Sequence, residues 1–162
     1  MDFSNSIASK ICELSRMLQH VAELKLNKKT IAFTNGCFDL LHEGHAYSLS
    51  QAAQEADFLI VAINSDNSVK KLKGTNRPIN NENTRALQVA SISMVDAVII
   101  FDAETPFQLI DSILPDVLVK GGDYTIDQIV GAKEVINAGG KVVINPILNG
   151  FSTTTLIEKM SK

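Results

Sequence analysis

The chain has 162 residues, of which 45% are hydrophobic and 20% charged, and its net charge at pH 7 is −3. This length fits one domain with a hydrophobic core, and the slightly acidic balance argues against a broad basic surface for nucleic acid or anionic membranes. The two cysteines indicate no disulfide framework, and no stretch resembles a signal peptide or a membrane span. We therefore expect a cytoplasmic protein.

The first 29 residues form a predicted helical extension. Apolar residues recur at spacings of three and four from Ile7 to Leu24, which predicts one amphipathic helix over about residues 6–24. We expect this helix to pack on the main domain or on a partner subunit, and we assign residues 30–162 to that domain.

In the main domain, predicted strands and helices alternate. Phe58–Ile63 is a nearly continuous apolar run, which is typical of a strand covered on both faces. The strands are expected at about 30–34, 58–63, 97–101, 117–120 and 141–144, and the helices at about 43–55, 82–94, 105–113 and 129–138. This order predicts an α/β fold: a Rossmann-like, doubly wound sheet of five parallel strands, with ligands beyond the strand carboxyl ends.

The most informative stretch follows the first predicted strand and runs from Thr34 to His45, TNGCFDLLHEGH. A buried strand, a glycine-containing turn and a helix N-terminus in this order can bind an anion, with the backbone N–H groups of residues 36–38 facing a phosphate. His42 and His45 are three residues apart, so they share the first turn of the helix. Two imidazoles there can stabilise negative charge that develops on phosphorus.

Two other interpretations of the histidine pair stay open. His-x-x-His can be half of a zinc site, with Cys37 and Asp39 nearby, although no other His/Cys pair occurs in the chain. The histidines can also be inert surface or core residues.

Residues 73–83, KGTNRPINNEN, form a predicted polar loop beside this site. The loop carries Lys73 and Arg77 and follows further lysines, which favours a mobile lid that closes on phosphate. The alternative is a solvated surface loop with incidental charges.

The tail from Gly150 to Met160 is a second candidate phosphate site. Ser152 or Thr153 can cap a helix whose first turn also carries Thr154. Together with the first helix N-terminus, this one could hold a single triphosphate.

The turn Asn35–Asp39 followed by His42–His45 resembles the signature of the nucleotidyltransferase superfamily that carries a His-x-Gly-His motif. Most of the remaining chain resembles the heptose 1-phosphate adenylyltransferases, on the stretches VKKLKGTNRPI, VDAVIIFDAETP, ILPDVLVKGGDYT and GFSTTTLIEKM. Glycerol 3-phosphate cytidylyltransferases are the nearest alternative. Their pattern has an arginine where this chain has Ile147, which argues against cytidylyl transfer.

The resemblance implies transfer of AMP from ATP to D-glycero-D-manno-heptose 1-phosphate, giving ADP-heptose for lipopolysaccharide core biosynthesis. It implies Mg²⁺ bridging the phosphates, no protein-bound metal, a homodimer, and a separate heptose kinase upstream. A module that binds nucleotide without catalysis is the alternative of another class.

The expected catalytic residues are His42, His45 and Lys73. The expected nucleotide-binding residues are Asn35, Gly36, Cys37, Phe38, Gly121, Asn149, Ser152, Thr153 and Thr154. The expected sugar phosphate contacts are Asp39, Arg85, Lys120 and Asp123, the last because a carboxylate accepts hydrogen bonds from sugar hydroxyls.

Overall fold

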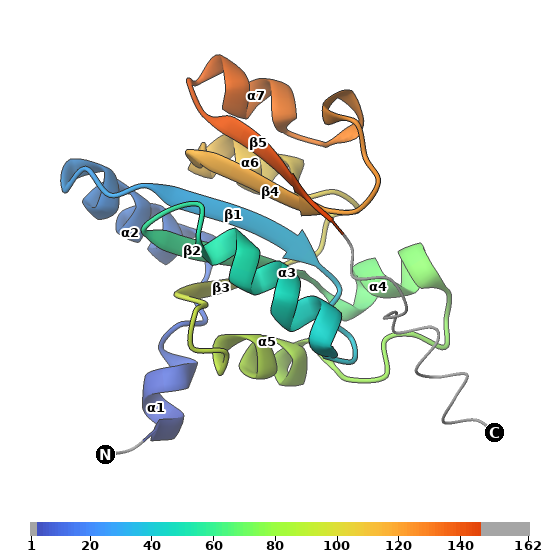
Figure 1. Cartoon of the computed structure of the whole chain (residues 1–162). Helices are drawn as coiled ribbons and strands as arrows, with labels where there is room; N and C mark the ends of the chain where they lie inside the picture. Colours follow the sequence, from blue (N-terminus) through green and yellow to red (C-terminus); the bar gives the residue numbers. More distant parts are fainter. Residues whose placement is uncertain (1–2, 147–162) are drawn as a thin grey trace.

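The computed structural model describes residues 3–146 and contains one five-stranded sheet with strand order β3-β2-β1-β4-β5 (Figure 1). Every neighbouring pair of strands is parallel, so all five carboxyl ends meet at one edge. The predicted doubly wound, Rossmann-like sheet is confirmed. The strands are β1 (Ile31–Gly36), β2 (Phe58–Asn64), β3 (Ala97–Phe101), β4 (Val117–Gly121) and β5 (Lys141–Asn145).

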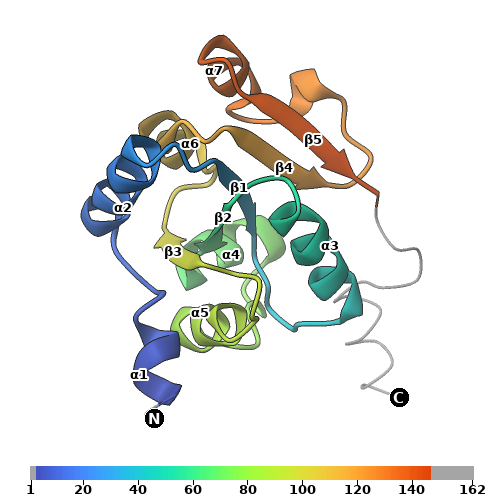
Figure 2. The ribbon, with the colours of Figure 1, turned by 60° about the vertical axis from the view of Figure 1, so that its left-hand side comes forward.

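Helices cover both faces of the sheet (Figure 2). Successive strand residues alternate between the two faces. Ile31 and Phe33 face one apolar cluster, and Ala32 between them faces the other. The first cluster is closed by α2 (Leu14–Leu26), α6 (Phe107–Ile113) and α7 (Ala132–Asn137), and the second by α3 (Glu43–Ala53) and α5 (Glu82–Ala90). Burial on both faces explains the continuous apolar runs in the sequence.

The order of the strands fixes where ligands can bind. From β1 the chain winds outward through β2 to β3, and then it crosses back to place β4 on the other side of β1. The connections therefore diverge at the carboxyl ends of β1 and β4, which leaves a crevice at that point of an open α/β sheet.

The N-terminal segment differs from its prediction. Instead of one helix there are two, α1 (Phe3–Ala8) and α2, because residues 10–12 pair with the edge strand β3. Val98 N donates to Lys10 O (2.8 Å) and Cys12 N to Val98 O (3.0 Å). An edge strand has unpaired backbone groups, and satisfying them interrupts the helix. Met17 on α2 is 0% exposed, so the segment contributes to the core.

Other differences concern the ends of elements. The 82–94 helix ends at Ala90, and the 129–138 helix begins later, as α7 at Ala132, preceded by a 3-10 turn, η1 (Ile126–Gln128). The short segment after β2 is a helix, α4 (Asp66–Lys73), whose N-cap Ser65 accepts a hydrogen bond from Ser68 N. Among the helices of residues 3–146, none is long and apolar enough to cross a membrane.

Candidate active site

The turn after β1 is tightly folded around the Phe38 ring. A Cβ on Gly36 would lie 2.9 Å from Phe38 Cε2, so a glycine is needed at this position. Phe38 itself has a φ of 48°, in the left-handed region that side chains rarely adopt. Its ring is almost fully buried, with its centroid 5.3 Å from that of His45. Phe38 therefore packs against the predicted catalytic pair, and only its backbone is available to a nucleotide.

His42 and His45 meet at the start of α3, as the sequence predicts. His42 is the N-cap residue, and its carbonyl accepts a hydrogen bond from His45 N (2.9 Å). The two ring centroids lie 3.8 Å apart with 30° between the planes. Both Nδ1 atoms are buried and have no hydrogen-bond partner within the described residues. The pair thus presents polar atoms that residues 3–146 leave unsatisfied.

The surroundings of both imidazoles favour their neutral forms in the free protein. Burial, the neighbouring His42 and the charge of Lys73 lower the pKa of His45 to about 4, against a weaker opposing effect of a hydrogen bond with the Leu40 backbone. Burial also lowers the pKa of His42, against the opposing charge of Glu43. A bound polyphosphate would reverse the electrostatic part of this shift, because negative charge favours the imidazolium.

A cavity of about 360 Å³ opens at the β1/β4 divergence, next to the same turn. Gly36 and Cys37 contribute to its wall and also belong to the histidine turn. The polar side chains around it come from the ends of several strands and from η1: Asn35, Asn64, Glu104, Thr105, Lys120 and Gln128. The histidine pair and the cavity are therefore adjacent places for ligand groups, joined at Gly36 and Cys37.

Lys120 is the cation of this cavity. It extends from the end of β4, and its Nζ donates to Asn35 Oδ1 (3.2 Å) and lies 5.9 Å from the centre of the Tyr124 ring. Burial lowers the pKa of its ammonium group. A partly desolvated ammonium with one neutral hydrogen-bond acceptor is well suited to bind an anion.

The positions of three other predicted residues give weaker support for a contact with substrate. Cys37 Sγ contacts Asn64 Oδ1 at 3.8 Å in the cavity wall. A Cβ on Gly121 would lie 3.3 Å from Ser48 Oγ, so this glycine lets the end of β4 approach α3. Asp123 is exposed and does not line the cavity. Glu104, Thr105 and Gln128 line it instead. Sequence reasoning missed them, although Glu104 and Thr105 follow a strand end.

Lys73 lies at the basic C-terminal turn of α4, together with Lys70 and Lys71. All three are exposed. Among them, only Lys73 acts on the pKa of His45. This electrostatic contact places Lys73 nearest to the histidine pair.

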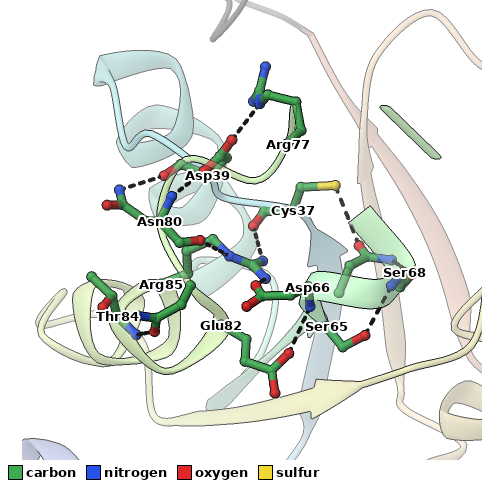
Figure 3. A network of polar contacts seen from close by, with 12 residues as sticks. Cys37, Asp39, Ser65, Asp66, Ser68, Arg77, Asn80, Glu82, Thr84 and Arg85 are labelled. Carbon is green, nitrogen blue, oxygen red and sulfur yellow. Dashed lines mark hydrogen bonds and ion pairs between the residues drawn. The ribbon is translucent and has the colours of Figure 1, made fainter. Parts of the chain in front are cut away.

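Asp39 is buried and forms hydrogen bonds with residues of the predicted lid (Figure 3). Its carboxylate accepts hydrogen bonds from Arg77 Nε (2.6 Å), Ile79 N (2.8 Å) and Asn80 N (3.0 Å). Burial acts to raise the pKa of Asp39, but these three donors together lower it. Arg77 was predicted to move freely onto phosphate, and this is corrected because its Nε is bound to a buried carboxylate. Its Nη2 has no partner within the described residues.

Arg85 is fully buried, with a relative exposure of 0%. Its guanidinium donates to Cys37 O (Nη1, 2.7 Å), Asp66 Oδ1 (Nη2, 2.8 Å) and Asn80 O (Nε, 3.0 Å). The direct contact with substrate phosphate that the resemblance implies is therefore not available to Arg85 in this arrangement. The guanidinium joins three segments of the protein.

Four predicted nucleotide-binding residues, Asn149, Ser152, Thr153 and Thr154, lie outside the described residues, as does Ile147. In the part of the chain that is described, no group of three or more His, Cys, Asp or Glu side chains is arranged to hold a metal ion.

Comparison with known proteins connects this geometry to a family. The cytidylyltransferase-like family model matches residues 33–159, from within β1 to the tail. The chain belongs to the cytidylyltransferase-like family. It is accordingly a nucleotidyltransferase, and the matched region contains the histidine turn, the cavity residues and α4.

Curated relatives of this cytidylyltransferase-like chain are named bifunctional protein HldE. The protein from Koribacter versatilis is 55% identical over 151 residues, and that from Hyphomonas neptunium is 51% identical over 146 residues. These alignments cover 93% and 90% of this chain but only 31% and 30% of the relatives. The chain thus corresponds to about a third of their length.

Solved structures with the same fold include the lipopolysaccharide core biosynthesis protein from Thermoplasma volcanium, with a TM-score of 0.59 and 25% identity over 74% of this chain and 97% of that one. Pantoate-beta-alanine ligase from Francisella tularensis has a TM-score of 0.57 at 16% identity, over 84% of this chain and 66% of that one. The second likeness concerns the fold alone.

Proposed function

We propose that this nucleotidyltransferase transfers the adenylyl group of ATP to D-glycero-D-manno-heptose 1-phosphate, giving ADP-heptose and pyrophosphate. One observation carries the proposal: a histidine pair at a helix N-terminus, with ring centroids 3.8 Å apart, shares its turn with a cavity that contains a half-buried lysine. Similarity to the HldE proteins and to a lipopolysaccharide core biosynthesis protein supports the sugar phosphate acceptor and the pathway.

The two ligand places suit the two substrates. The triphosphate lies at the N-terminus of α3, where His42, His45 and the free backbone N–H groups face it. The sugar phosphate occupies the cavity, with its phosphate near Lys120 and its hydroxyls near Glu104, Thr105 and Gln128. These carboxylate, hydroxyl and amide groups can bond to a polyol, and we assign them this role in preference to the exposed Asp123.

The reaction needs no general base. An oxygen of the sugar phosphate, already anionic, attacks the α-phosphorus of ATP, and the bond from that phosphorus to the bridging oxygen breaks as pyrophosphate leaves. His42 and His45 donate hydrogen bonds to the phosphoryl oxygens, and Lys73 stabilises the charge that moves onto pyrophosphate. Mg²⁺, when bound, would neutralise phosphate charge, coordinated mainly by phosphate oxygens and water.

Adenylyl rather than cytidylyl transfer is supported by Ile147, which stands where the cytidylyltransferase pattern has an arginine. The acceptor also requires a kinase that phosphorylates C1 of the sugar. We propose that the enzyme acts after that step in the cytoplasm and forms a homodimer.

The test is pyrophosphate release with six substrate pairs: ATP or CTP, each with the α anomer of heptose 1-phosphate, the β anomer, or glycerol 3-phosphate. We expect ATP with one heptose 1-phosphate anomer to be the best pair, and the His42→Ala, His45→Ala double variant to be inactive. Preference for CTP with glycerol 3-phosphate would reassign the substrate. Nucleotide binding by calorimetry without turnover of any pair would make the chain a binding module.

A further inference from the structure

Two buried charged residues, Asp39 and Arg85, connect the histidine turn to the loop between α4 and α5 (Figure 3). They do not contact each other directly and are joined through Asn80. Asn80 N donates to Asp39 Oδ1, Asn80 Nδ2 to Asp39 O (2.9 Å), and Asn80 O accepts from Arg85 Nε. We call this set of contacts the Asn80 bridge. Buried charges contribute little net stability but can fix one conformation, so their presence beside a reactive turn suggests a functional role.

Arg85 determines the orientation of one peptide group in the turn. Its Nη1 donates to the carbonyl of Cys37 at 2.7 Å, so this carbonyl points toward the buried Arg85 side chain. In a trans peptide the next N–H points in the opposite direction, so the Phe38 N–H is directed away from Arg85. Within residues 3–146 this N–H has no acceptor. It is therefore a preset donor at the turn that we assign to phosphate.

Asp39 fixes the loop that follows the α4 lysines. Through Ile79 N, Asn80 N and Arg77 Nε, it binds the second half of the loop to the histidine turn. The start of α4 is bound separately, since Asp66 N donates to Glu82 (2.7 Å) and Arg85 Nη2 donates to Asp66. The stretch between these two anchors, residues 67–76, carries Lys73 at the end of α4.

We propose that Asp39 and Arg85 are positioning residues for nucleotidyl transfer. Arg85 holds the Phe38 N–H toward the reacting phosphate, and Asp39 holds the base of the loop so that closure brings Lys73 to the same phosphate. The proposal rests on the function proposed above. It replaces both a freely moving 73–83 lid and direct substrate contacts of these two residues.

The test uses Asp39→Asn and Arg85→Lys, with Asp57→Asn as a matched control. Asp57 also accepts from a lysine (Lys29 Nζ, 3.0 Å) and a backbone N–H (Thr30 N, 2.9 Å), but it lies at the opposite end of β1. Asn80→Ala, which removes only the Asn80 side-chain contact with Asp39 O, serves as a milder variant if the charge changes prevent folding. For each folded variant, kcat, KM for both substrates and amide hydrogen exchange are measured.

We expect kcat of Asp39→Asn and Arg85→Lys to fall on the order of 10- to 100-fold, since misplacement by about 1 Å can have this effect, while KM for ATP changes by less than about threefold. Asn80→Ala should lower kcat less. In Asp39→Asn the amides of Ile79 and Asn80 should exchange faster in the absence of any substrate. Asp57→Asn should keep wild-type kcat.

A merely structural role would lower the melting temperature but leave kcat per folded molecule near wild type in every variant, and that result would overturn the proposal. Unchanged exchange at Ile79 and Asn80 in Asp39→Asn would also overturn it. If the wild-type chain transfers no nucleotidyl group to any acceptor, the proposed function fails and the catalytic role fails with it. Exchange at residues 79 and 80 still decides whether Asp39 holds the loop.

Discussion

The imidazole rings of His42 and His45 stack with their centroids 3.8 Å apart, and neither Nδ1 has a hydrogen-bond partner within residues 3–146. Two neutral rings in contact can donate to one phosphate without mutual repulsion. We expect His45→Ala to lower kcat by on the order of 10²–10³, as for loss of one transition-state donor, and to change ATP affinity by less than about tenfold. Calorimetry and initial rates on the purified variant check this. A kcat near wild type would remove His45 from the mechanism.

The low pKa of His45 should make stability depend on pH. Its pKa is about 4 in the folded protein and 6.5 in a model peptide, so between these values the unfolded chain binds more protons. Stability therefore falls as the pH drops from 6.5 to about 4. Urea unfolding of wild type and His45→Gln across this range measures the effect, which should be smaller in the variant because only His42 then contributes a lowered histidine pKa. NMR titration of His45 near 6.5 in the free protein would contradict the prediction.

Lys120 should act on the acceptor rather than on ATP. We expect Lys120→Gln to raise KM for the sugar phosphate on the order of 10- to 100-fold, because a phosphate in the cavity loses its nearest charge-assisted contact, and to leave KM for ATP almost unchanged. Lys141→Gln is the control, since Lys141 begins β5 at the far end of the sheet and pairs there with Glu55. Equal effects on both KM values would indicate that Lys120 binds the nucleotide.

Among the three lysines of α4, Lys73 should matter most, because only its charge acts on His45. We expect Lys73→Ala to lower kcat more than it weakens nucleotide binding, since its contact tightens as charge moves to pyrophosphate. Lys71→Ala, at a neighbouring exposed position, should have less than about a threefold effect on kcat. Similar losses in the two variants would assign the cluster a general electrostatic role.

Hydrogen exchange should divide the α4–α5 loop into two parts. Without ligand, the Ile79 and Asn80 amides should exchange slowly, because they donate to buried Asp39, and the amides of Thr75 and Asn76 should exchange fast. Adding both substrates should protect only the second pair further. Uniform fast exchange from residue 74 to residue 80 in the free protein would contradict this division and support the originally predicted mobile lid.

The sheet and the histidine turn were predictable because both follow from local patterns. Buried parallel strands appear as apolar runs, and the His42–His45 spacing fixes both side chains on one helical turn once the helix begins at Glu43. The interruption after α1 was not predictable in the same way. It depends on pairing between Ile11 and Val98, which are far apart in sequence and have no local signal for each other.

The buried charged residues were also not predictable, because their partners are distant in sequence. Asp39 and Arg85 were expected to contact substrate, Arg85 because of the family resemblance, and charged residues are usually exposed. Their burial depends on Asn80, whose backbone and amide satisfy both of them, and an asparagine in a polar loop carries no sign of that role. The cavity residues Thr105 and Gln128 were missed because they come from connections whose ends meet only in the folded sheet.

The pairing of residues 10–12 with β3 has a consequence for shortened forms of this protein. A chain that starts at residue 30, where the sequence pattern suggests a boundary, would lack both the backbone partners of Val98 and the Met17 side chain that fills one face of the core. The bared strand could then pair with the same strand of another molecule, a common route to aggregation. A shortened form that is to remain monodisperse should therefore keep the chain from before Lys10.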